Sequence, residues 1–158
     1  QASDSSFEIR QIFRHKKRFL DLLLLADEQE SMIDLYLERG EMFALYDQNI
    51  LKTICVVTDE GGKTIELKNI ATDPQYQKQG YGKRLIRFIS EHYAGKYDTL
   101  LVGTGESPLT IPFYAQNGFK YSHRIKDFFT DNYDHPIYED GKQLVDMVYL
   151  RKELSKSK

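Results

Sequence analysis

The stretch "IELKNIATDPQYQKQGYGKRLIRFI", residues 65–89, joins a predicted strand to a predicted helix through a glycine-rich loop. The strand stops at Asp73-Pro74, and Gly80 and Gly82 come just before an apolar run with helical spacing. A helix N-terminus presents unpaired backbone N–H groups and about half a positive charge. Because glycine has no Cβ, the backbone there can close around an anion. The stretch therefore predicts an anion-binding loop, and a glycine pair that only makes a tight turn is the alternative.

Spacing excludes two common phosphate-binding motifs from this loop. The chain has no GxxxxGK[ST] sequence, and Arg84-Leu85 stand where a dinucleotide fingerprint would have its third glycine. Lys78 and Lys83 lie on either side of the glycines and would add positive charge around a bound anion.

The whole chain is predicted to form an α+β domain. Apolar periodicity and turn residues give the order β-α-α-β-β-β-α-β-α-β-β, and such mixed connections pack helices on a largely antiparallel sheet. Asp27 is the expected N-cap of the second helix, which ends at Gly40. The predicted strands cover residues 7–12, 42–46, 50–57, 64–72, 99–105, 119–129 and 144–154, and the later helices lie around residues 85–95 and 107–117.

Composition and charge exclude several classes of protein. The 158 residues include 41% apolar and 29% charged side chains, and the formal net charge of −2 gives no attraction to nucleic acid or to an anionic membrane. We expect no membrane span and no secretion signal. The single cysteine, Cys55, excludes an intrachain disulfide and fits a reducing cytoplasm. The expectation is one cytoplasmic domain over residues 1–158, in which residues 1–6 are a flexible tail or a cloning remnant.

The loop and its surroundings resemble the acetyl-CoA signature of the GNAT superfamily of N-acetyltransferases. "NIATDPQYQKQGYGKRLI" matches the pattern Q/R-x-x-G-x-G/A at residues 77–82, after the family's usual strand ending and D-P turn. "FYAQNGF", residues 113–119, resembles the family's F/L-Y-x-x-x-G-F ending, and the tail from Asp127 to Leu150 resembles a small bacterial GNAT subgroup of poorly defined substrate. The resemblance implies the GNAT (acyl-CoA N-acyltransferase) fold, with a mixed, mostly antiparallel central sheet, a splayed strand pair and flanking helices.

The same resemblance implies how acetyl-CoA binds. Backbone N–H groups of residues 78–83 would hold the pyrophosphate, and unpaired backbone at the end of the splayed strand would bind the pantetheine arm. Ser107 stands where many relatives have an asparagine that contacts CoA, but it could equally be only a helix N-cap. The expected acetyl-CoA-binding residues are Ile70, Ala71, Thr72, Gln77, Lys78, Gln79, Gly80, Tyr81, Gly82, Lys83 and Ser107.

Direct acetyl transfer to an amine poses two protonation problems. Neutralising an alkylamine of pKa near 10.4 at pH 7 costs about 4.6 kcal/mol, and the leaving thiolate benefits from a proton donor. The resemblance places Tyr114 beside the thioester as the donor and Glu66, on the cofactor strand, as a base acting through water. A tyrosine that only packs the core and a solvated strand glutamate are the alternatives. Some relatives carry the glutamate on the neighbouring strand, at the position of Gly103 here, so the base is Glu66 or water.

Other reactive residue types give weaker indications. Cys55 is expected to be a small buried strand residue rather than a nucleophile. The histidines are dispersed, and no spacing suggests a metal site. The tail from Asp127 to Asp146 interleaves acidic and aromatic residues, which would suit a cationic amine, a solvated loop or a dimer contact.

We therefore expect an N-acetyltransferase that transfers an acetyl group from acetyl-CoA to a primary amine by direct attack in a ternary complex. The expected partner is a small-molecule or peptide amine, with no nucleic acid or membrane partner and with a homodimer possible. A transferase using another acyl-CoA and a non-catalytic acyl-CoA-binding sensor are the alternatives. The acceptor stays open because acceptor surfaces vary most within this superfamily.

Overall fold

The computed structural model describes residues 6–154. These residues fall into two compact units, one formed by residues 6–59 and 67–92 and the other by residues 60–66 and 93–154. Most of the expected tail lies outside the described residues, but Ser6 is described, and its hydroxyl donates a hydrogen bond to Asp47 Oδ1 at 2.9 Å. No helix within residues 6–154 is long and apolar enough to cross a membrane.

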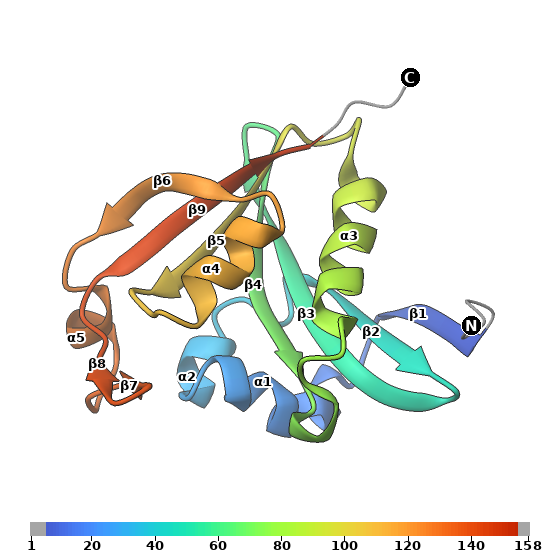
Figure 1. Cartoon of the computed structure of the whole chain (residues 1–158), viewed down its shortest axis with the longest axis horizontal. Helices are drawn as coiled ribbons and strands as arrows, with labels where there is room; N and C mark the ends of the chain where they lie inside the picture. Colours follow the sequence, from blue (N-terminus) through green and yellow to red (C-terminus); the bar gives the residue numbers. More distant parts are fainter. Residues whose placement is uncertain (1–5, 155–158) are drawn as a thin grey trace. The chain divides into compact units, whose positions relative to one another are not determined.

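The first unit contains the strands that lead to the glycine loop (Figure 1). β1 pairs antiparallel with β2, β2 pairs antiparallel with β3, and β4 lies next to β3. Gln48 and Asn49 make the tight β2–β3 turn with φ angles of 54° and 66°, the left-handed geometry that two-residue hairpins require. The strand bounds are β1 (Phe7–Ile12), β2 (Glu41–Asp47), β3 (Ile50–Gly61) and β4 (Thr64–Thr72).

α1 and α2 bury their apolar faces in one core, whereas α3 contacts Phe43 on β2 through Phe88 and His92. Leu23 and Ile33 pack with Met42 and Ile54 in that core, and all four side chains are inaccessible to solvent. The helical spacing seen in the sequence is confirmed by these contacts, because each apolar stripe faces the strands. The helical segments are η2 (Lys16–Phe19), α1 (Leu20–Ala26), α2 (Glu30–Ile33), η3 (Pro74–Tyr76) and α3 (Tyr81–Tyr93).

The predicted capping of the second helix is wrong. α2 is a single turn that begins at Glu30, and the chain continues to Gly40 as turns. Asp27 instead ends α1, and its carboxylate accepts a hydrogen bond from the Tyr36 hydroxyl at 3.1 Å. The buried Lys16 ammonium donates to the Gly40 carbonyl at 2.7 Å and so holds the end of the segment. These contacts between distant residues override the local capping pattern.

The second unit is built on three antiparallel strands. β9 lies between β5 and β6, with Gly103 opposite Tyr149 on one side and His123 opposite Tyr149 on the other. α4 follows β5, and a hydrogen bond of 2.6 Å between the Thr104 and Thr110 hydroxyls joins the two elements. The bounds are β5 (Thr99–Gly105), α4 (Thr110–Gln116), β6 (Lys120–Ile125) and β9 (Met147–Glu153).

The last two predicted strands are too long. The first ends at Ile125, because Asp127 adopts a left-handed φ of 58° and the short helix α5 (Phe128–Asn132) follows. A two-stranded hairpin, β7 (Tyr138–Glu139) and β8 (Lys142–Gln143), comes next and precedes β9 (Figure 1). The Phe129 amide donates to the Val145 carbonyl at 2.8 Å, which ties α5 to the segment before β9.

Candidate functional site

The glycine loop is folded back onto the end of β4. The Asp73 carboxylate accepts a hydrogen bond from the Gln75 amide at 2.9 Å and caps η3. The Gln77 side chain donates to the Thr72 carbonyl at 3.2 Å and so links the loop to the strand. These two contacts fix where the chain leaves the strand and where it enters α3.

The backbone of the loop is shaped for a helix N-terminus open to solvent. Lys78 and Gly80 have left-handed φ angles of 64° and 88°, and α3 begins directly afterwards at Tyr81. A Cβ at Gly80 would meet no atom within 4 Å, so glycine is favoured there by the backbone conformation rather than by space. Lys78, Gly80 and Lys83 are exposed. Unpaired N–H groups at a helix start, flanked by two lysines, favour an anion, and the binding of CoA phosphate there stays a prediction.

Tyr81 contributes backbone to this helix start and uses its side chain elsewhere. Its hydroxyl donates to Asp47 Oδ2 at 2.9 Å, and its ring lies 6.0 Å from the Phe7 ring. Burial, together with the hydrogen bond to Asp47, raises the pKa of Tyr81. Lys52 Nζ lies over the Tyr76 ring at 3.3 Å from its centroid, which adds a second attachment for the loop. Sequence reasoning missed Asp47 and Lys52 because their partners are far away along the chain.

The strand end that would receive the pantetheine arm is already partly hydrogen-bonded within the protein. Thr53 Oγ1 donates to the Ala71 carbonyl at 2.8 Å, and Thr72 Oγ1 donates to Thr53 Oγ1 at 3.0 Å. Ala71 is buried, while Ile70 and Thr72 are half-buried. Thr53 therefore holds the end of β4 in place, and the pantetheine contact stays a prediction.

Tyr114 lies in the second unit, buried on α4. Its ring makes edge contacts with the Phe113 and Phe119 rings, at centroid distances of 5.3 and 5.6 Å. Burial, with a smaller effect of the Glu139 charge, raises the pKa of Tyr114 above its ordinary value. The hydroxyl therefore keeps its proton at neutral pH, which a proton donor requires.

Glu66 is buried rather than solvated, so the alternative of an exposed, solvated strand glutamate does not hold. Only 7% of the residue is accessible, and the Tyr149 hydroxyl donates to its Oε2 at 3.2 Å. The Tyr149 ring also covers the neighbouring strand. A Cβ at Gly103 would lie 3.0 Å from Tyr149 Cζ and 2.9 Å from Met147 Sδ, so a side chain there would require the Tyr149 and Met147 side chains to shift.

Ser107 behaves as a turn residue at the start of α4. It is buried, and its Oγ accepts hydrogen bonds from the Leu109 and Thr110 amides at 3.1 and 3.4 Å. These bonds satisfy backbone donors that a helix start leaves unpaired. Its contact with CoA stays a prediction.

The surroundings of Cys55 and His92 indicate structural roles for both residues. Cys55 is fully buried, and burial raises the pKa of its thiol, so the reactive thiolate is disfavoured. The His92 ring stacks on Phe88 with a centroid distance of 5.4 Å, and it meets Phe43 edge-on. Within residues 6–154, no group of three or more histidine, cysteine, aspartate or glutamate side chains is arranged to hold a metal ion.

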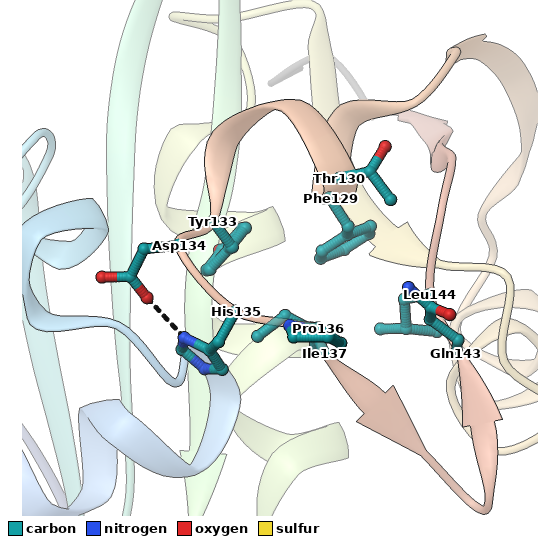
Figure 2. A pocket seen from close by; sticks show the side chains of 9 residues that line it. All are labelled: Phe129, Thr130, Tyr133, Asp134, His135, Pro136, Ile137, Gln143 and Leu144. Atoms are coloured by element: carbon teal, nitrogen blue, oxygen red, sulfur yellow. Dashed lines mark hydrogen bonds and ion pairs between the residues drawn. The ribbon is translucent and has the colours of Figure 1, made fainter.

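The acidic, aromatic tail forms a small core with a cavity of about 230 Å³ beside it. Phe129, Ile137 and Leu144 are buried together in this core. Figure 2 shows these three side chains facing the same space, with Asp134 and His135, whose side chains are hydrogen-bonded to each other, to one side. Much of the aromatic pattern in the tail is therefore explained by packing between α5 and the β7–β8 hairpin.

Asp146 is held by ion pairing and is not a solvated carboxylate. It accepts hydrogen bonds from the Asp127 amide at 2.9 Å and from Arg124 at 2.8 Å. The Asp127 amide and the Arg124 guanidinium hold the pKa of this carboxyl below its ordinary value. Arg124 also forms an ion pair with Glu106, at 3.2 Å. The ion pairs of Arg124 therefore connect β6 with the end of β5.

The predicted site residues are thus distributed over both units. The first unit holds the end of β4 together with the loop of residues 77–83, linked by Gln77. The second unit holds Glu66, Ser107 and Tyr114. Of the residues that sequence reasoning missed, Tyr149 makes direct contact with a predicted catalytic group, and no local signal in "DMVYL" marks it.

Comparisons with known proteins identify the family. A model of the acetyltransferase (GNAT) domain matches residues 38–121, more than half of the chain. The N-acetyltransferase YvbK of Bacillus subtilis (strain 168), itself uncharacterised, is 39% identical over 137 residues, which cover 85% of this chain and 88% of that protein.

Solved structures give the same answer and confirm the predicted fold class. A GNAT family acetyltransferase from Elizabethkingia anophelis with acetyl-CoA bound is 33% identical, with a TM-score of 0.87, covering 94% of this chain and 99% of that one. A Bacillus subtilis acetyltransferase in complex with CoA is 35% identical, with a TM-score of 0.85 and the same coverage. This chain is therefore an N-acetyltransferase that belongs to the GNAT family.

Proposed function

We propose that this enzyme transfers the acetyl group of acetyl-CoA to a primary amine by direct attack in a ternary complex. The observation that carries the proposal is the open N-terminus of α3, where Lys78 and Gly80 adopt left-handed conformations and two lysines flank the helix start. Phosphate groups bind such helix ends through backbone N–H groups. Two similar structures, at 33% and 35% identity, hold acetyl-CoA and CoA, which supports the choice of co-substrate.

In the proposed reaction the amine nitrogen attacks the thioester carbonyl carbon. The amine enters as an ammonium ion and loses one proton before it attacks; the C–N bond then forms and the C–S bond breaks. The sulfur takes a proton and leaves as the thiol of CoA, and the second proton lost by the nitrogen replaces the one that the donor has given. Glu66 accepts the amine proton through a water molecule, and the Tyr114 hydroxyl donates a proton to the sulfur. The burial of both residues supports these roles, because hydrogen bonds from fixed groups to developing charges are stronger where bulk water is excluded.

The loop of residues 77–83 binds the pyrophosphate in this proposal, and residues 70–72 bind the pantetheine arm. Lys78 and Lys83 supply charge, while Gln79, Gly80, Tyr81 and Gly82 supply backbone. Gln77 keeps the loop attached to β4 through the Thr72 carbonyl. No metal ion is required by the proposed chemistry.

Calorimetric titration with acetyl-CoA and with CoA, followed by a thiol-release screen, tests the proposal. The screen should include a polyamine, an amino sugar, an aminoglycoside, a free amino acid and a short peptide with a free N-terminus. Binding together with amine-dependent thiol release is the expected result. Binding without thiol release from any amine would favour an acyl-CoA sensor. Thiol release only with a longer acyl-CoA would mean that acetyl-CoA is not the acyl donor. No binding would refute the assignment of the loop to CoA.

A further inference from the structure

The hydrogen bond between Tyr149 and Glu66 joins residues that are 83 positions apart in the chain. Both residues are buried, with 8% and 7% of their surface accessible. The hydroxyl donates to Oε2 at 3.2 Å. A buried carboxylate needs such donors, and a donor from a rigid strand also fixes the direction in which the carboxylate points.

The Tyr149 ring is itself held from both neighbouring strands. On β5, Gly103 lies opposite Tyr149 in the register, and the absence of a Cβ there leaves room for the ring edge. On β6, the His123 ring stacks on the Tyr149 ring, with centroids 4.7 Å apart and planes 2° apart. The aromatic ring therefore has little freedom to turn, and the position of its hydroxyl is set by the sheet.

We propose that Tyr149 is the positioning residue for Glu66 in acetyl transfer, with Gly103 and His123 holding the Tyr149 ring in place. This inference rests on the proposed role of Glu66 as the base. It also explains the glycine at position 103. Because Gly103 has no side chain, the Tyr149 ring has room beside β5, and the Tyr149 hydroxyl supports Glu66 on β4. Tyr149 acts through Glu66 and does not itself contact the reacting atoms in this proposal.

The proposal is tested by comparing Tyr149→Phe, Glu66→Gln and the double variant. The assay is steady-state thiol release from acetyl-CoA with the fastest amine of the screen above. Tyr149→Phe keeps the ring and removes the hydroxyl, so we expect kcat to fall on the order of tenfold to 100-fold while the calorimetric Kd for acetyl-CoA stays within about twofold. The double variant should be no slower than Glu66→Gln alone, because both changes disable the same group.

Two outcomes separate the inference from the function on which it rests. If Glu66→Gln lowers kcat but Tyr149→Phe does not, or if their effects multiply in the double variant, the positioning role is refuted and the base stands. If Glu66→Gln leaves kcat unchanged, the base assignment fails and the inference fails with it. Tyr121→Phe, an exposed tyrosine on the adjacent β6, is the matched control and should leave kcat unchanged.

A second variant keeps the test decisive if Tyr149→Phe folds poorly. His123→Ala removes the stacked ring from an exposed position, so the fold should tolerate it. A freer Tyr149 ring would orient Glu66 less well, and we expect a severalfold fall in kcat with an unchanged Kd for acetyl-CoA. An unchanged kcat in His123→Ala would refute the part of the proposal that assigns His123 to hold the ring.

Discussion

Replacing Tyr114 with phenylalanine is the sharpest test of the proposed chemistry. The change removes one hydroxyl and keeps the ring contacts with Phe113 and Phe119. Burial raises the pKa of Tyr114 above about 10, so fewer than about one molecule in 1,000 lacks the proton at pH 7. Essentially every wild-type molecule therefore carries the donor, and every variant molecule lacks it.

The size of the loss follows from the leaving group. General acids contribute roughly 10²- to 10⁴-fold, but a thiol with a pKa near 8.5 leaves as a thiolate more easily than an alkoxide does. We therefore expect the lower end, a fall in kcat of about 100-fold, equivalent to about 2.7 kcal/mol in the barrier. The free energy of unfolding should change by no more than about 1 kcal/mol, because the packed ring is kept.

Steady-state thiol release gives kcat, calorimetry gives the Kd for acetyl-CoA, and denaturant unfolding reports stability. The expected pattern is a low kcat with a nearly unchanged Kd. The exposed Tyr121→Phe serves again as the control. Equal kcat values in wild type and Tyr114→Phe would refute the proton-donor role, and a parallel loss of stability and activity would show that Tyr114 only packs the core.

Three further predictions concern the loop, the core and alkaline pH. Gly82→Val should abolish CoA binding in calorimetry by crowding the phosphate, and near-normal affinity would show that the loop does not bind CoA. Leu23→Ala should lower the free energy of unfolding by about 2–5 kcal/mol in a denaturant titration, because Leu23 is fully buried. The control Leu25→Ala, at a 52% exposed position, should lower it by less than about 0.5 kcal/mol. Equal losses would contradict the assigned core. Burial raises the pKa values of Tyr36 and Tyr114 above about 10, the value in the unfolded chain, so the folded state favours their neutral forms. The stability that they contribute is complete below pH 10. It is lost as pH rises from about 10 toward the folded-state pKa values, because only the unfolded chain ionises there. Unfolding free energies measured from pH 8 to pH 11 should therefore fall above pH 10, and a flat profile would contradict the burial of these hydroxyls.

Local patterns in the sequence were sufficient for most of the elements. The predicted strands at residues 7–12, 64–72 and 99–105 agree with β1, β4 and β5, because alternating or continuous apolar residues leave few other ways to bury them. The glycine loop was visible for a similar reason. Left-handed backbone is unfavourable for most residues, so Gly80, placed directly before α3, marks the loop in the sequence itself, whereas Gly82 lies in the first turn of α3 without a left-handed φ.

Contacts between distant residues decided what the local patterns could not. Asp27 satisfies the helix-capping rule but bonds Tyr36 instead, and Asp127 ends a strand that apolar alternation would have continued. In both cases a hydrogen bond or a packed cluster from elsewhere in the chain outweighs a local preference worth about 1 kcal/mol.

The candidate site divides in the same way. The sequence by itself predicted Tyr114 and Glu66 as the catalytic residues and the loop that would hold the co-substrate, through its resemblance to motifs with fixed spacing. Only the tertiary structure decided that Glu66 is buried against Tyr149 and that the missing side chain at Gly103 makes room for that tyrosine. The physical reason is that burial, and the hydrogen bonds that burial demands, depend on which strands pair, and strand pairing brings together residues that no local pattern connects.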